Sequence, residues 1–117
     1  MQEKRRMPRI RESNEVTITI IADRKKPVRQ KTGATKDISA SGVRIQTDIF
    51  LPVDALLNVD LSLKKLEKKI NALGKVRWTR MIVEEGSYEA GVEFVNAPVS
   101  AIQLLRDYIR RIISGRT

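Results

Sequence analysis

The chain of 117 residues contains neither cysteine nor histidine. Disulfides and thiolate zinc sites are therefore excluded, and so are nucleophile–base pairs built on Cys or His. Only carboxylate, lysine and serine chemistry remain as routes to catalysis. We therefore expect a protein that is not an enzyme and that holds no metal and no cofactor. The lack of cysteine is also compatible with a reducing cytoplasm, which is the expected location.

Aromatic residues make up only 4% of the chain, so its core must be mostly aliphatic. No apolar run approaches the roughly 20 residues that a membrane span needs. The basic N-terminus is not followed by an apolar segment, so we expect neither a signal peptide nor a membrane span. A hydrophobic fraction of 41% is ordinary for a globular protein, and the length suits a single domain.

Cations are abundant: Lys and Arg number 23 against 14 Asp and Glu, for a net charge of +9. Such an excess favours an anionic partner, which can be a nucleotide, a nucleic acid or an anionic membrane surface. Net charge alone does not choose among these partners, and it also aids solubility.

Six segments alternate apolar and polar residues, which predicts β-strands; in the first, threonines separate Val16, Ile18 and Ile20. A kink or bulge is expected at Gly33. Residues 98–113 instead carry apolar side chains at three- and four-residue steps, which predicts an amphipathic helix. The pattern indicates a mostly-β fold, a six-stranded antiparallel β-barrel with a C-terminal α-helix. The strands are expected at residues 15–22, 28–38, 43–47, 57–63, 70–81 and 89–95.

The first thirteen residues differ from the rest of the chain. They are basic and polar and are interrupted by Pro8, which disfavours a helix. We therefore expect residues 1–13 to be a tail or loop, a basic N-terminal arm rather than a helix. Residues 14–117 are expected to form the barrel with its helix as a single domain.

An Arg-x-x-x-Arg motif lies in this arm, at Arg5 and Arg9, with Arg6 between them. The motif is weak by itself, because a chain this rich in arginine should contain on the order of one by chance. Arg106 and Arg110 form a second pair on the polar side of the predicted helix. For Arg5, Arg6 and Arg9 taken alone, a solvated basic tail is the favoured explanation.

A second motif, Asp-x-Ser-x-x-Gly, is formed by Asp37, Ser39 and Gly42 in a predicted turn between two strands. By chance it would occur in roughly a few per cent of such chains. Together and in this order, the two motifs and the predicted elements resemble the PilZ domain family over nearly the whole chain. The resemblance implies a bacterial signalling effector that binds cyclic di-GMP through Arg5, Arg6, Arg9 and the second motif, and that regulates a protein partner.

The residue types of the two motifs suit this ligand, which carries two phosphates and two guanines. An arginine can fork onto a phosphate or onto guanine O6 and N7. Asp37 should avoid phosphate, but it can accept from guanine N1–H and N2–H₂, and Ser39 can bond either part. Gly42 would permit a positive φ and a close approach of the ligand. A simpler reading is that Asp37 or Ser39 caps the turn and that Gly42 is only a turn residue.

Trp78 is the only tryptophan. Alternation places it on the same face as Val76, so packing in or near the core is slightly favoured. The alternative is a platform on which a guanine stacks.

Two other functions compete with cyclic di-GMP binding. A nucleic-acid-binding small barrel would share the positive charge, but few aromatic residues are present for base stacking, which disfavours it. A PilZ-like adaptor that acts without nucleotide is disfavoured by the intact motifs. In the favoured reading the arm is loose without ligand, and binding orders it and changes the surface that a partner contacts.

Overall fold

The computed structural model of the chain describes residues 8–21 and 29–115. Within them lie seven strands, one α-helix, and two short 3-10 helices, η1 (Lys64–Leu66) and η2 (Val83–Glu85). The strands and the helix are β1 (Arg9–Ile10), β2 (Glu15–Ile20), β3 (Arg29–Ser39), β4 (Gly42–Thr47), β5 (Leu56–Leu63), β6 (Lys68–Ile82), β7 (Ser87–Asn96) and α1 (Val99–Ser114).

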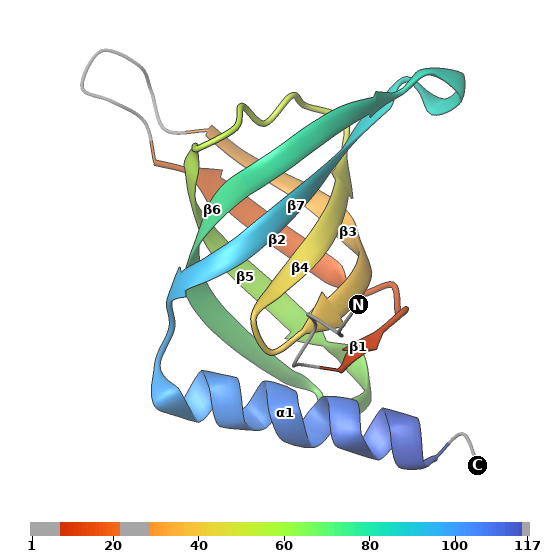
Figure 1. Cartoon of the computed structure of the whole chain (residues 1–117), viewed down its shortest axis with the longest axis vertical. Helices are drawn as coiled ribbons and strands as arrows, with labels where there is room; N and C mark the ends of the chain where they lie inside the picture. Colours follow the sequence, from red (N-terminus) through yellow and green to blue (C-terminus); the bar gives the residue numbers. More distant parts are fainter. Residues whose placement is uncertain (1–7, 22–28, 116–117) are drawn as a thin grey trace, which may run out of the picture.

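The six long strands form a closed antiparallel barrel (Figure 1). Their hydrogen-bonded order is β3-β2-β5-β6-β7-β4, and the pairing of β4 with β3 closes the ring. The predicted six-stranded barrel with a C-terminal helix is therefore confirmed. The two-residue strand β1 pairs with β3 outside this ring, with Arg9 opposite Ser39. It lies within the segment that was expected to be an arm without strand structure.

The barrel interior is filled by aliphatic side chains, as the low aromatic content requires. In β5, the inward residues Leu57, Val59, Leu61 and Leu63 are buried and alternate with partly exposed polar residues. Burying a side chain of this size contributes about 1.5–3 kcal/mol relative to leaving it exposed. The alternation of the sequence is thus the alternation between the two faces of the barrel wall.

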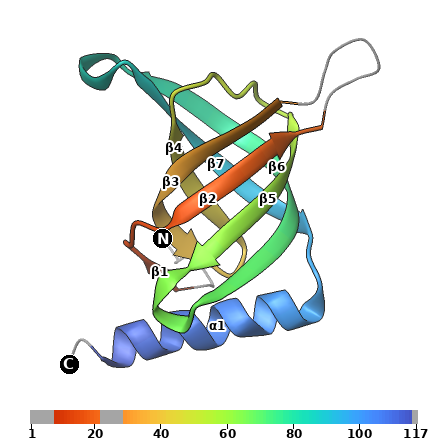
Figure 2. The ribbon, with the colours of Figure 1, turned by 180° about the vertical axis from the view of Figure 1, so that it is seen from behind.

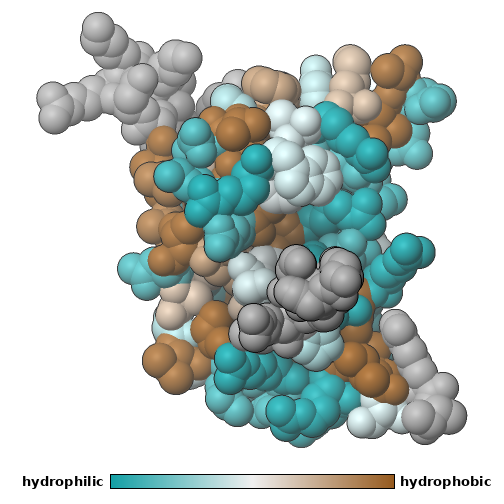
Figure 3. Space-filling model, viewed as in Figure 1, coloured by the Kyte–Doolittle hydropathy of each residue, from teal (hydrophilic) through white to brown (hydrophobic). Residues whose placement is uncertain are grey.

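Helix α1 lies across one end of the barrel (Figure 2). It buries Ala101, Leu105, Tyr108 and Ile109, which share one helical face, and it contacts β1, β3 and β6. The middle of its solvent side is hydrophilic (Figure 3). Within the residues that the structure describes, no helix is long and apolar enough to cross a membrane.

Glu12 ties the segment between β1 and β2 to the helix. The hydroxyl of Tyr108 donates to Oε1 of Glu12, which also accepts from Nδ2 of Asn14 at 3.0 Å, and Nζ of Lys65 lies 3.2 Å from Oε2. Burial alone would raise the pKa of Glu12. The hydrogen bonds from Tyr108, Asn14 and Lys65, together with the charge of Lys65, outweigh burial and hold this pKa below its ordinary value of 4.5.

Tyr108→Phe removes the hydroxyl from this cluster and tests its contribution. A hydrogen bond to a charged acceptor is lost, so we expect the free energy of unfolding at neutral pH to fall by about 1–2 kcal/mol. The pKa of Glu12 is lower in the folded chain than in the unfolded one. The stability that ionised Glu12 contributes is therefore present above pH 4.5 and is lost as the pH falls through the folded-state pKa.

Urea denaturation of both proteins at neutral pH and at about pH 3 measures this effect. The difference between them should shrink at the lower pH, because the stability that ionised Glu12 contributes is lost as the pH falls below 4.5 toward the lowered pKa. A difference that does not change with pH would contradict a role for the ionised carboxylate.

Candidate functional site

A β-bulge in β3 turns Asp37 onto the outer face of the barrel. Thr35 is buried on the inside, and strict alternation would place Asp37 inside as well. The register shifts between these two residues, so that Asp37 pairs with Arg44 on the outer face. The extra residue is Lys36, which is exposed. The irregularity expected at Gly33 therefore lies three residues further along.

A second bulge does the same for Trp78 in β6. Val76 pairs with Val92 and is buried, but the register shifts after it and Trp78 pairs with Gly91. The extra residue is Arg77. Trp78 consequently lies on the outer face with 41% of its surface exposed. The prediction that Trp78 shares the core-facing side of Val76 is wrong, because a one-residue insertion in the pairing inverts the face of every residue after it.

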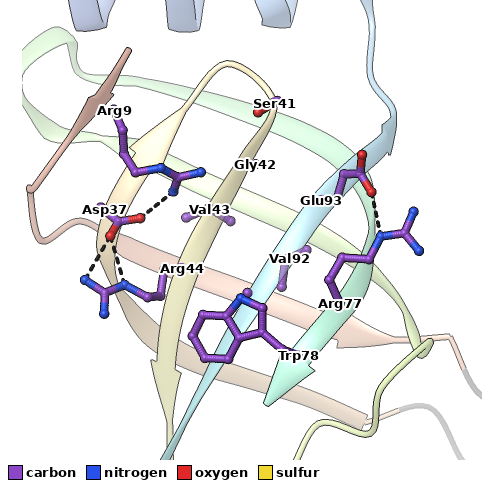
Figure 4. A pocket seen from close by; sticks show the side chains of 11 residues that line it. Arg9, Asp37, Ser41, Gly42, Val43, Arg44, Arg77, Trp78, Val92 and Glu93 are labelled. Carbon is purple, nitrogen blue, oxygen red and sulfur yellow. Dashed lines mark hydrogen bonds and ion pairs between the residues drawn. The ribbon is translucent and has the colours of Figure 1, made fainter. Parts of the chain in front are cut away.

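The outward residues of these strands enclose a pocket of about 460 Å³ on the barrel wall (Figure 4). Two glycines line it: a Cβ at Gly42 would overlap the carbonyl oxygen of Val92, and a Cβ at Gly91 would overlap the indole of Trp78. Of the described glycines only Gly86 has a positive φ, so the positive φ expected at Gly42 is wrong. Gly42 instead allows close packing of the backbone. The pocket is lined by Arg9, Asp37, Ser41, Gly42, Val43, Arg44, Arg77, Trp78, Gly91, Val92 and Glu93.

One wall of the pocket is an ion-paired cluster around Asp37. Nη1 of Arg9 donates to Oδ1 of Asp37 at 2.5 Å, while Nε and Nη2 of Arg44 both lie 2.8 Å from Oδ2. The Asp37 side chain is only 10% exposed, and two guanidiniums offset the cost of burying its charge. Each guanidinium has five N–H donors, so both arginines keep donors for a ligand.

The opposite wall carries Trp78 and Arg77. Nε of Arg77 donates to Oε1 of Glu93 at 2.5 Å, and the guanidinium carbon of Arg80 lies 6.0 Å from the centre of the indole ring. The pocket thus places cationic donors and a carboxylate opposite an exposed aromatic face. Such a combination suits a ligand that is both anionic and planar. Within residues 8–21 and 29–115, no cluster of acidic side chains could hold a metal ion.

Most of the residues proposed from the sequence meet at this pocket. Arg9, Asp37, Gly42 and Trp78 line it, and Ser39 lies beside it, with its Oγ 3.4 Å from Nη2 of Arg9. Ser39 also bonds the backbone N–H of Ser41, as the capping interpretation expects. The other two proposed residues, Arg5 and Arg6, are outside the described residues.

Sequence reasoning missed Arg44 and Gly91. A signal for Arg44 existed, because alternation between Val43 and Ile45 places it on the outer face directly after the second motif. Its partner Asp37 could not be identified, since the bulge between them changes the register. Gly91 is a glycine within a predicted strand, which marks a close approach but does not name the approaching group.

Comparison with known proteins gives a family and several similar folds. A family model described as PilZ domain matches residues 3–111, whereas a search among curated proteins finds no match. The Bacillus subtilis inhibitor of motility (MotI/DgrA) has a TM-score of 0.81 at 18% identity, covering 99% of this chain and 55% of that protein. The K. pneumonia MrkH–c-di-GMP complex has a TM-score of 0.76 at 22% identity, covering 98% and 55%.

The separate PilZ domain with c-di-GMP of YcgR from Escherichia coli is also similar, with a TM-score of 0.69 at 12% identity. That alignment covers 97% of each chain. At such low identities the likeness of the solved structures shows the fold. The present chain spans about half the length of the first two proteins, 55% of each.

Gly91→Ala tests whether the missing side chain determines the position of Trp78. The atoms nearest to the added Cβ all belong to the indole, so we expect the indole to move while the backbone stays in place. The free energy of unfolding should fall by about 1 kcal/mol. Emission of Trp78, the single tryptophan, should shift to the red as the ring becomes more exposed.

The control is the same substitution in a Trp78→Ala background. Without the indole, Gly91→Ala should have almost no further effect on stability. An equal loss in both backgrounds would show that the added Cβ clashes with another group.

Proposed function

Because the chain belongs to the PilZ domain family, we propose that it is a receptor that binds cyclic di-GMP in the pocket between Arg9 and Trp78. One observation carries the proposal. Arg9 of the first motif, Asp37 and Gly42 of the second, and the single tryptophan Trp78 lie far apart in the sequence but line the same pocket. Two similar solved structures, of MrkH and of the PilZ domain of YcgR, contain c-di-GMP, which supports the choice of ligand.

Each wall of the pocket has a distinct role in this proposal. The guanidiniums of Arg9 and Arg44 donate to phosphate oxygens or to guanine O6 and N7. A guanine stacks on the exposed face of Trp78. Gly42 and Gly91 let the backbone of Val92 and the indole of Trp78 pack closely, which supports the shape of the pocket. Arg5 and Arg6 of the N-terminal segment supply further positive charge.

Asp37 changes partners when the ligand binds. In the structure, Arg9 bonds Oδ1 and Arg44 bonds Oδ2. When Arg9 turns toward a phosphate, Oδ1 becomes free to accept from guanine N1–H and N2–H₂. Arg44 meanwhile keeps its ion pair with Oδ2, so the carboxylate stays oriented and compensated. The same residue therefore holds Arg9 before binding and selects guanine afterwards.

The receptor acts as an effector rather than as an enzyme in this proposal. The pocket lies on the outer wall of the barrel, so a bound dinucleotide becomes part of the surface that another protein can contact. A protein partner in the cytoplasm then reads the difference between the free and the occupied surface.

Isothermal titration with cyclic di-GMP tests the proposal, together with Arg9→Ala. The wild-type chain should bind, and the variant should bind at least about 100-fold more weakly because it loses charged donors to the ligand. Its thermal stability should change little, because Asp37 retains both contacts with Arg44. A large loss of stability would show instead that Arg9 is structural.

Arg106→Ala is the matched control, because Arg106 belongs to the second Arg-x-x-x-Arg pair and lies exposed on α1. This variant should bind like the wild type. Titration with oligonucleotides of increasing length tests the alternative function. Binding that strengthens with length and depends steeply on salt would indicate a nucleic-acid-binding protein. The absence of heat and of stabilisation at high cyclic di-GMP concentration would contradict the proposal.

A further inference from the structure

Glu89 is a buried carboxylate on the outer face of the barrel. Its neighbour in β7, Ala90, belongs to the core, so alternation directs Glu89 outward, yet its side chain is only 5% exposed. Arg80 lies over it, with Nε at 3.0 Å and Nη2 at 2.8 Å from Oε1. Nη1 of Arg44 lies 3.5 Å from the same oxygen. A buried carboxylate is costly unless it is paired, and here two guanidiniums share it.

These two guanidiniums extend to opposite walls of the pocket. Arg44 continues to Asp37, which holds Arg9 on the charged wall. Arg80 lies over the ring of Trp78 on the aromatic wall. Charges of alternating sign therefore cross five strands in spatial order: Arg9 on β1, Asp37 on β3, Arg44 on β4, Glu89 on β7 and Arg80 on β6.

We propose that Glu89 is a positioning residue for this pocket, holding Arg44 on one wall and Arg80 against Trp78 on the other. The inference rests on the proposed function, since it concerns the same pocket and the same ligand. Glu89 is not among the residues that line the pocket, so it acts through Arg44 and Arg80.

Two effects of opposite sign distinguish positioning from simple charge. A negative charge near the site repels a ligand with two phosphates, so removing it would strengthen binding if charge alone mattered. Salt screens this through-space effect. Loss of the carboxylate also frees Arg80 and removes one of the two ion pairs that hold Arg44, the other being with Asp37. Misplaced donors weaken binding. The direction of the change in affinity therefore decides between them.

Glu89→Gln preserves the shape of the side chain and removes its charge. Cyclic di-GMP affinity should fall about tenfold, or about 1.4 kcal/mol, in isothermal titration. In the unliganded protein, Trp78 emission should change, because Arg80 is no longer held over the indole. Arg80→Gln changes an exposed residue, so it should fold in any case. It should reproduce the emission change and part of the affinity loss.

Glu93→Gln is the matched comparison. Glu93 lines the pocket and pairs with Arg77, so the variant removes the same charge closer to the ligand without releasing Arg44 or Arg80. It should bind more tightly than the wild type and leave Trp78 emission unchanged. Opposite shifts in affinity for Glu89→Gln and Glu93→Gln would support positioning.

If Glu89→Gln binds as tightly as the wild type or more tightly, the inference is overturned, while binding by the wild type still supports the proposed function. If the wild type does not bind, the proposed function fails. The emission of the unliganded variants still tests Glu89 in that case. Unchanged Trp78 emission in both Glu89→Gln and Arg80→Gln would show that the carboxylate does not position Arg80.

Discussion

A closed β-barrel assigns its residues to two faces by strict alternation, and the whole site depends on where that alternation is interrupted. Along β5 the alternation holds without exception, and every second side chain is buried. The bulges at Lys36 and Arg77 break it. Each inserts one residue and turns the next side chain outward, so that Asp37 and Trp78 lie over the wall of the barrel instead of within it. Without the bulge at Lys36 the pocket would lose the carboxylate of Asp37, and without the bulge at Arg77 it would lose the indole of Trp78.

Four arginines that the structure describes around the pocket are each paired with a carboxylate, which has consequences for selectivity. Arg9 and Arg44 bond Asp37, Arg77 bonds Glu93, and Arg80 bonds Glu89. The spare donors of these guanidiniums can bond an approaching anion, but an anion that draws a guanidinium away must replace its ion pair. A simple anion offers no compensation to the carboxylate that is released. A ligand that carries both phosphate and guanine can compensate it, because the guanine edge donates to the freed oxygen.

The sequence predicts the elements of this fold better than the details of its site. Periodicity of two and of three to four residues depends only on which side chains must be buried, so the six strands of the barrel and α1 could be placed from it, whereas β1 was not predicted. A turn at this point was also predicted from its residue types, but it comprises only Ala40 and Ser41, and the motif residues Asp37, Ser39 and Gly42 belong to β3 and β4. A bulge changes pairing by one residue and leaves almost no trace in the apolar pattern. The outward direction of Trp78 and the partners of Arg44 and Glu89 depend on the register between paired strands. They could therefore be identified only from the structure.

The side of the pocket formed by β1 is held by fewer strand pairings than its other sides. Strands β4, β6 and β7 each pair with neighbours on both sides, so the wall that they form is fixed by the closed ring. In the described part of the chain, β1 pairs only with β3, and over two residues. A ligand that draws Arg9 away from Asp37 acts on the most weakly paired strand of the site. The segment after β1 continues to Glu12, whose bond to Tyr108 reaches α1. β1 and Glu12 therefore connect the Arg9 side of the pocket to α1, whereas β4, β6 and β7 belong to the closed ring.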